Sequence, residues 1–347
     1  MTPLGFGRAR RGAAVFAACA LLAGGGRIGA AAQAQPAAAA APHRIDADRL
    51  FSDVSALSAP TMEGRRTGTA GNKLAQQLII ERFRELKLQP PAGWTDFAQK
   101  FSFVLSGRGG SVAYPDATNL VGMVPGTSNP DQFLIVSAHY DHLGQRNGQT
   151  YRGADDNASG VAALLQVAAY VAAHPPRHSV LFAAFDAEEE GLQGAKYFVK
   201  HPPVDLKRTA LVVNLDMVSR NDKGVIFASG TAFDPSLKDL VGKAAAGRQL
   251  TVKLGHDRRG VAGEDDWTQQ SDQGAFHDAG VKTLYFGVED HADYHKPGDT
   301  ADKINRGFFV DAAETILDAV IALDEALPST AAIAPRPAID VEPLIRK

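Results

Sequence analysis

Five short segments, far apart in the chain, contain side chains that bind divalent metal ions well. They are His139-Tyr140-Asp141, Gly153-Ala154-Asp155-Asp156-Asn157, Glu188-Glu189-Glu190-Gly191-Leu192, Asn214-Leu215-Asp216 and Tyr294-His295. Imidazoles and carboxylates without a nearby cysteine suit a catalytic pair of divalent ions better than a structural site. Each segment alone has an ordinary interpretation, such as a helix N-terminus for the glutamates or a turn for the aspartates. Together they predict a two-metal site.

Apolar runs of strand length indicate how these segments are positioned. Four such runs, apolar on both faces, cover residues 133–138, 180–185, 210–215 and 281–286. They are typical of the central strands of a mostly parallel sheet with helices on both sides. Two further strands are expected at 101–105 and 119–124, and helices at 74–86, 161–173 and about 191–199.

This alternation predicts an α/β fold with three layers, αβα, and a mostly parallel central sheet. Ligands of such sheets bind beyond the carboxyl ends of the strands. His139, Glu188, Glu189 and Asp216 all follow a predicted strand closely. The sequence therefore places the candidate metal ligands together at one edge of the sheet.

Composition supports a packed soluble domain without nucleic acid as a partner. The chain has 347 residues, 45% hydrophobic and 22% charged, and a net charge of −3. These fractions are ordinary for globular proteins, and the small negative charge gives no reason to expect nucleic acid binding. With no internal repeat, we expect one folded domain over residues 45–326, after a disordered linker at 35–44 and before a Pro/Ala-rich tail at 327–347.

The first 34 residues have the pattern of a signal peptide. Arg8, Arg10 and Arg11 precede an apolar stretch at 12–23, and small residues lead to an A-x-A cleavage site at Ala34. The apolar stretch is too short to span a bilayer. We therefore expect an exported protein, periplasmic or extracellular, with no integral membrane segment after cleavage. A lipoprotein anchor at Cys19 is the less favoured alternative.

The five segments with candidate metal ligands, together with residues 271–280, resemble the co-catalytic dizinc aminopeptidases of the bacterial leucyl aminopeptidase type, a family of zinc-dependent exopeptidases. The resemblance covers about residues 120–304 and implies two zinc ions (Zn2+) per chain. It implies that Asp156 bridges both ions, that His139 and Asp216 complete one position, and that Glu189 and His295 complete the other. Because the family often has a cis peptide bond after the bridging aspartate, we expect one at Asp156-Asn157.

The resemblance also implies roles for residues that do not bind metal. Glu188 is expected to be the general base, taking a proton from the water that bridges the zinc ions and passing it to the leaving amine. Asp141, which follows His139 by two residues and so lies on the same side of an extended chain, is expected from this spacing to accept the ring N–H of His139 that does not face zinc. Tyr294 matches a tyrosine that some members use to stabilise the oxyanion. The implied activity is that of a metallo-aminopeptidase acting on peptide substrates.

The remaining histidines and aromatic residues have ordinary interpretations. The histidines expected to be at the surface or structural are His43, His142, His174, His178, His201, His256, His277 and His291. The aromatic residues expected in the core rather than in the substrate wall are Trp267, Phe276, Tyr285 and Phe286. A hydrophobic specificity pocket near Phe276 stays open. Ser271-Asp272-Gln273 departs from the Ser-Asp-His of many relatives, so the family's specificity does not carry over.

Three other functions remain open at this point. Glutaminyl cyclases share the fold but use one zinc ion and have a longer, tryptophan-containing stretch after the paired glutamates. In this chain the corresponding stretch is short. Carboxypeptidases are a second alternative. A non-catalytic, receptor-like module is a third, although such proteins lose metal ligands and all five are present in this chain. The physiological metal and the oligomeric state are also open, because ligand type sets metal preference only loosely.

Overall fold

The computed structural model describes residues 43–107, 110–258, 260 and 265–328. The predicted signal peptide, Cys19, most of the linker and most of the Pro/Ala-rich tail lie outside these residues. None of the helices in the described part is long and apolar enough to cross a membrane.

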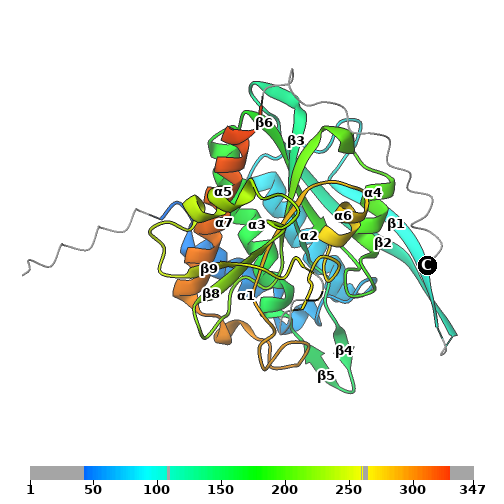
Figure 1. Cartoon of the computed structure of the whole chain (residues 1–347). Helices are drawn as coiled ribbons and strands as arrows, with labels where there is room; N and C mark the ends of the chain where they lie inside the picture. Colours follow the sequence, from blue (N-terminus) through cyan, green and yellow to red (C-terminus); the bar gives the residue numbers. More distant parts are fainter. Residues whose placement is uncertain (1–42, 108–109, 259, 261–264, 329–347) are drawn as a thin grey trace, which may run out of the picture. The chain divides into compact units, whose positions relative to one another are not determined.

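The central element is an eight-stranded sheet (Figure 1). Its strands are β1 (Ala98–Gly107), β2 (Gly110–Val124), β3 (Asn129–His139), β6 (His178–Phe185), β7 (Thr209–Leu215), β8 (Val225–Ser229), β9 (Thr251–Leu254) and β10 (Thr283–Gly287). They lie in the order β1-β2-β6-β3-β7-β10-β8-β9. The four predicted central strands are neighbours, β6-β3-β7-β10, and all three pairs among them are parallel. The predicted strand at 119–124 is the end of the longer strand β2.

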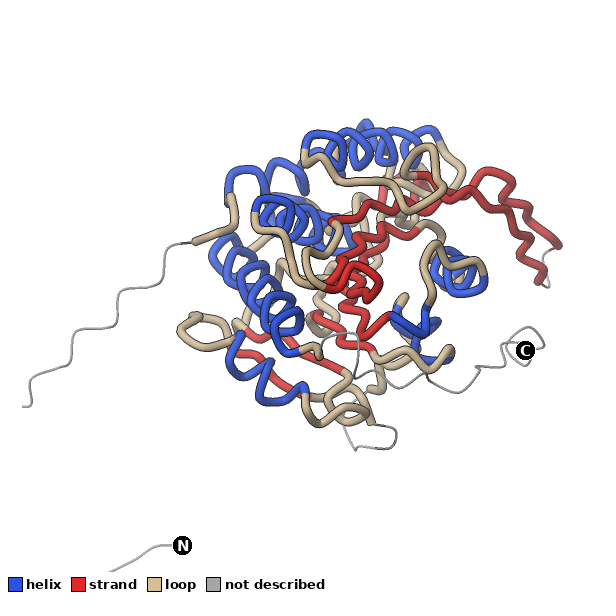
Figure 2. Tube along the Cα trace, turned by 90° about the horizontal axis from the view of Figure 1, so that it is seen from above, coloured by secondary structure: helices blue, strands red, loops and turns tan. Residues whose placement is uncertain are grey.

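Helices cover both faces of this sheet, so the predicted α/β fold with three layers is confirmed (Figure 2). The helices are α1 (Ala47–Leu57), α2 (Ala70–Glu85), α3 (Gly160–Ala173), α4 (Gln193–Lys200), α5 (Leu237–Ala244), α6 (Gln273–Asp278) and α7 (Arg306–Ala326). One layer contains α3, packed on the sheet, with α1 and α7 packed against it. The other layer contains α4 and α6, which contact each other and the sheet. A small hairpin of β4 (Gly144–Arg146) and β5 (Gln149–Tyr151) follows β3.

The apolar residues of the central strands explain these two layers. In β3, Leu134 and Val136 belong to the hydrophobic cluster that includes α3, while Ile135 belongs to the cluster that includes α4 and α6. In β6, Phe182 and Phe185 divide in the same way. Because alternate side chains of a strand point to opposite faces, a strand buried on both faces is apolar throughout.

Candidate metal centre

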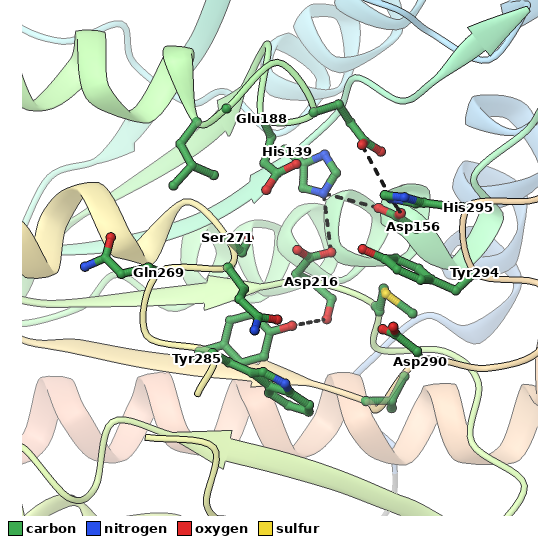
Figure 3. A pocket seen from close by; sticks show the side chains of 17 residues that line it. His139, Asp156, Glu188, Asp216, Gln269, Ser271, Tyr285, Asp290, Tyr294 and His295 are labelled. Carbon is green, nitrogen blue, oxygen red and sulfur yellow. Dashed lines mark hydrogen bonds and ion pairs between the residues drawn. The ribbon is translucent and has the colours of Figure 1, made fainter. Parts of the chain in front are cut away.

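The five sequence-predicted metal ligands lie together at one edge of the sheet, where the central parallel strands end. His139 is the last residue of β3, Asp216 follows β7, and Glu189 follows β6 after a short turn. Asp156 lies in the turn before α3, and His295 lies in the loop after β10. Figure 3 shows the side chains of four of them converging on one cavity, and Glu189 also lines this cavity.

Three of these side chains form a first group. His139 Nε2 lies 3.4 Å from Asp156 Oδ1 and 3.3 Å from Asp216 Oδ1. All three side chains are buried, and one ligand atom of each lies within 4.8 Å of the others.

A second group shares Asp156 with the first. His295 Nε2 lies 3.1 Å from Asp156 Oδ2 and 3.4 Å from Glu189 Oε2. The two oxygens of Asp156 thus face different histidines, Oδ1 facing His139 and Oδ2 facing His295. A carboxylate arranged in this way can bridge two metal ions.

The spacing of these atoms fits divalent ions. Ligand atoms about 2.0–2.2 Å from a tetrahedral zinc ion lie roughly 3.3–3.6 Å from one another. The four contacts above range from 3.1 to 3.4 Å. The donors are nitrogen and oxygen only, which suits Zn2+ and other divalent ions of similar preference. The two groups are therefore two candidate metal positions that share Asp156.

The turn that carries Asp156 is held from several sides. Asp299 accepts hydrogen bonds from the backbone N–H groups of Asp155 and Asp156, and the Asp156-Asn157 peptide bond is cis, as predicted. Asp155 turns away from the cavity, because its Oδ1 accepts hydrogen bonds from the backbone and hydroxyl of Ser219. The turn begins at Gly153, whose φ is +55° and where a Cβ would come within 2.0 Å of the Asp156 carbonyl oxygen.

Arg65 joins this turn to the end of β3. Its buried guanidinium donates to the carbonyls of Tyr140 (2.8 Å) and Gly153 (2.8 Å), and also to those of Leu57 and Arg152. Burial lowers the pKa of Arg65 to about 10, so the side chain stays charged at neutral pH. One side chain therefore fixes two loops that carry candidate metal ligands relative to each other.

Asp141 has a different contact from the one predicted. The ring Nδ1 of His139 lies 3.2 Å from the backbone carbonyl of Asp141 and 3.6 Å from its carboxylate. The Asp141 carboxylate instead accepts the backbone N–H groups of Glu188 (3.0 Å) and Glu189 (3.3 Å). The side chain that was expected to orient a histidine therefore holds the glutamate turn.

Glu188 lines the same cavity and belongs to neither metal group. Burial raises the pKa of its carboxyl well above the usual range, His139 offsets this in part, and Asp272 and Asp216 raise it further. Two cations beside Glu188 would lower that pKa again, which would bring the carboxyl into the range useful for proton transfer.

Tyr294 also lines the cavity, and its ring stacks on that of His295 with centroids 3.9 Å apart. Burial and the carboxylates of Asp156 and Asp216 raise the pKa of its phenol. The hydroxyl therefore keeps its proton at neutral pH and can donate a hydrogen bond.

His142, which was expected to be at the surface or structural, is not at the surface. The side chain is fully buried, and its Nδ1 lies 2.7 Å from Glu189 Oε1. One ligand atom from each of His142, Asp156 and Glu189 also lies within 4.8 Å of the others, so His142 lies beside the second metal group. A histidine three residues after His139 was the sequence signal available, but its direction depends on the loop after β3.

The cavity beside the metal groups has a volume of about 330 Å³. Trp267 and Tyr285 are buried, as expected, but they also line this cavity, so they contribute to its wall. Phe276 is fully buried and does not line it, which argues against a specificity pocket at that residue. Besides the metal ligands, Glu188 and Tyr294, the cavity is lined by Gly191, Leu192, Met217, Trp267, Gln269, Gln270, Ser271, Tyr285, Val288 and Asp290.

Gln273 connects β7, the strand that precedes Asp216, to this wall. Its Oε1 accepts a hydrogen bond from Asn214, two residues before Asp216, and its Nε2 donates to the Trp267 carbonyl at 2.7 Å. Gln273 therefore holds Trp267 in place relative to β7.

The chain is similar in sequence to several known proteins. Aminopeptidase YwaD of Bacillus subtilis is 28% identical over 220 residues, which cover 58% of this chain and 44% of that protein. The chain spans between 14% and 56% of the length of the curated relatives that it matches.

Solved structures share the fold. A zinc aminopeptidase from Bacillus subtilis has a TM-score of 0.62 and 19% identity, covering 81% of this chain and 95% of its own. A glutaminyl cyclase from Bacteroides thetaiotaomicron has a TM-score of 0.64 and 19% identity, covering 81% and 98%. The sequence model of peptidase family M28 matches residues 119–320, which is more than half of the chain and includes all five expected ligands. The chain belongs to peptidase family M28.

Proposed function

We propose that this protein is a zinc-dependent aminopeptidase that removes N-terminal residues from peptides. The proposal rests on one observation: the two carboxylate oxygens of Asp156 face different histidines, in a cavity that Glu188 also lines. Membership of peptidase family M28 supports hydrolysis of peptide bonds, and the similarity to aminopeptidase YwaD supports the choice of an aminopeptidase.

The proposed ligands are His139, Asp156 and Asp216 for one ion and Asp156, Glu189 and His295 for the other. The two ions would supply Lewis-acid polarisation of the scissile carbonyl and activation of water. Residues of the chain transfer the proton and stabilise the developing negative charge.

Glu188 Oε accepts the proton of the attacking water and then gives it to the nitrogen of the leaving amine. The Asp141 carboxylate keeps Glu188 and Glu189 on their respective sides of the cavity by holding their backbone N–H groups. The Tyr294 hydroxyl donates a hydrogen bond to the oxygen of the scissile carbonyl as negative charge develops there.

Glutaminyl cyclase activity is the alternative that the shared fold allows, because two of the compared structures with similar TM-scores are glutaminyl cyclases. At 17–19% identity these similarities concern the fold alone. The two candidate metal groups favour the two-ion peptidase. We also propose that the protein is exported, on the basis of the signal-peptide pattern of its first 34 residues.

The proposal is tested with purified protein loaded with zinc. We expect about two zinc ions per chain, release of free amino acid from a panel of aminoacyl-p-nitroanilides, and stepwise N-terminal shortening of an unblocked peptide. An N-acetylated copy of the peptide should resist. Shortening from the C-terminus would show a carboxypeptidase, and conversion of an N-terminal glutamine to pyroglutamate would show a cyclase. Absence of bound zinc at micromolar concentration would favour the receptor-like module.

A further inference from the structure

His142 occupies a position beside the second metal group that the family resemblance leaves without a role. It lies on the loop between β3 and the small β4–β5 hairpin, and its side chain is fully buried. Its Nδ1 is 2.7 Å from Glu189 Oε1 and 3.6 Å from Asp156 Oδ2. Its ring also packs edge-on against that of His295, with centroids 5.9 Å apart.

The contact between His142 and Glu189 has the distance of a hydrogen bond but not its direction. Among the described residues, neither ring nitrogen of His142 has a hydrogen-bond partner, and neither does Glu189 Oε1. Buried polar atoms without partners are rare in folded proteins because they lose hydration without compensation. A nitrogen and a carboxylate oxygen that both lack a partner and face the same place can share a cation if they separate from 2.7 Å to the roughly 3.3–3.6 Å expected between two ligand atoms of one zinc ion.

The two carboxylate oxygens of Glu189 face different histidines, as those of Asp156 do. Its Oε2 faces His295 at 3.4 Å, and its Oε1 faces His142. Asp156 Oδ2 faces the same two histidines, at 3.1 Å and 3.6 Å. Two imidazoles and two carboxylates therefore surround the second position, whereas one imidazole and two carboxylates surround the first.

Gly153 is part of this arrangement. A Cβ at residue 153 would come within 2.5 Å of His142 Cδ2, so the absence of a side chain there lets the imidazole lie against the turn that carries Asp156. The ring is thus confined between the Gly153 turn and Glu189. It has a fixed direction before any ion binds, which favours binding because little side-chain freedom is lost.

We propose that His142 Nδ1 is a fourth protein ligand of the second metal ion. The two metal positions are then unequal, with four nitrogen or oxygen donors from the chain at the second and three at the first. The ion at the second position is the more tightly held, and the first position keeps more room for water and substrate. This inference rests on the proposed two-metal function and adds a ligand to it.

The test counts imidazoles and measures zinc affinity directly. X-ray absorption spectroscopy at the zinc edge of the fully loaded protein should show three imidazoles for two ions in the wild type and two in His142→Gln. Zinc titration of the chelator-treated protein against a chromophoric chelator should show that His142→Gln weakens one site more than 100-fold and leaves the other nearly unchanged. A side chain that only orients a ligand typically contributes 10–100-fold.

His178→Gln is the matched control. His178 is a fully buried histidine paired with Asp324 at the start of β6, at the opposite end of the strand from the site, so its loss should leave both zinc affinities unchanged. Two imidazoles for two ions in the wild type would overturn the inference and leave the two-metal function standing. Failure of the wild type to bind two ions would overturn both.

Discussion

Replacing Glu188 with glutamine separates proton transfer from metal binding. The amide has nearly the same shape, and the backbone position is kept because the N–H of residue 188 still donates to Asp141 Oδ1, at 3.0 Å in the wild type. Glu188 belongs to neither metal group, so both ions should stay bound. The amide cannot accept the proton of the attacking water.

The expected loss follows from the value of a positioned general base. Such a group contributes roughly 10²–10⁴-fold to the rate, and each factor of ten corresponds to about 1.4 kcal/mol of activation free energy. We therefore expect kcat for a leucyl p-nitroanilide to fall by about 10²–10⁴-fold in Glu188→Gln. The fall in rate at low pH that protonation of Glu188 produces in the wild type should disappear.

The neighbouring glutamates provide matched controls for the same assay. Glu190 binds Arg66 (3.1 Å) and the Tyr114 hydroxyl (2.7 Å) away from the metal groups, so Glu190→Gln should keep both activity and zinc. Glu189→Gln should lose zinc from the second position as well as activity. Zinc content measured by mass spectrometry, together with kcat, distinguishes the three variants. Wild-type kcat in Glu188→Gln with two zinc ions bound would refute the assignment of the general base.

Three further predictions concern stability, metal removal and substrate charge. Arg65→Met should lower the free energy of unfolding in urea by on the order of 4 kcal/mol, because about 1–3 kcal/mol is lost for each buried carbonyl left without a donor; a loss below about 1 kcal/mol would contradict this explanation. Chelation of zinc should abolish activity and lower the melting temperature, since zinc at 100 times its Kd adds about 2.7 kcal/mol of stability. The melting temperature of Asp156→Asn should not depend on zinc. The cavity is lined by five carboxylates and, among the described residues, by no lysine or arginine, so Asp290→Asn should reduce kcat/KM for lysyl relative to leucyl p-nitroanilides by about 2–5-fold; an unchanged ratio would exclude Asp290 as the source of a charge preference.

The central part of the fold follows from local pattern. A strand buried on both faces must be apolar along its whole length, and a polar residue directly after it marks where the strand ends. This rule alone is enough to predict that His139, Asp216 and the paired glutamates lie at one edge of the sheet, as they do. Strand β9 lacks such a pattern because it is mostly exposed, whereas β8 is buried throughout but only five residues long; neither strand is among those expected from the sequence.

What the sequence determined by itself is the set of strands that carry the metal ligands and the edge at which they meet, because alternation and burial act over neighbouring residues. The tertiary structure alone decided the directions of side chains in the loops. β3 ends at His139, so the two-residue alternation of a strand no longer applies to Asp141, which turns to the N–H groups of the glutamate turn. His142 enters the metal centre and Trp267 enters the cavity wall for the same reason. Their directions depend on contacts with segments distant in sequence, and no local pattern records these contacts.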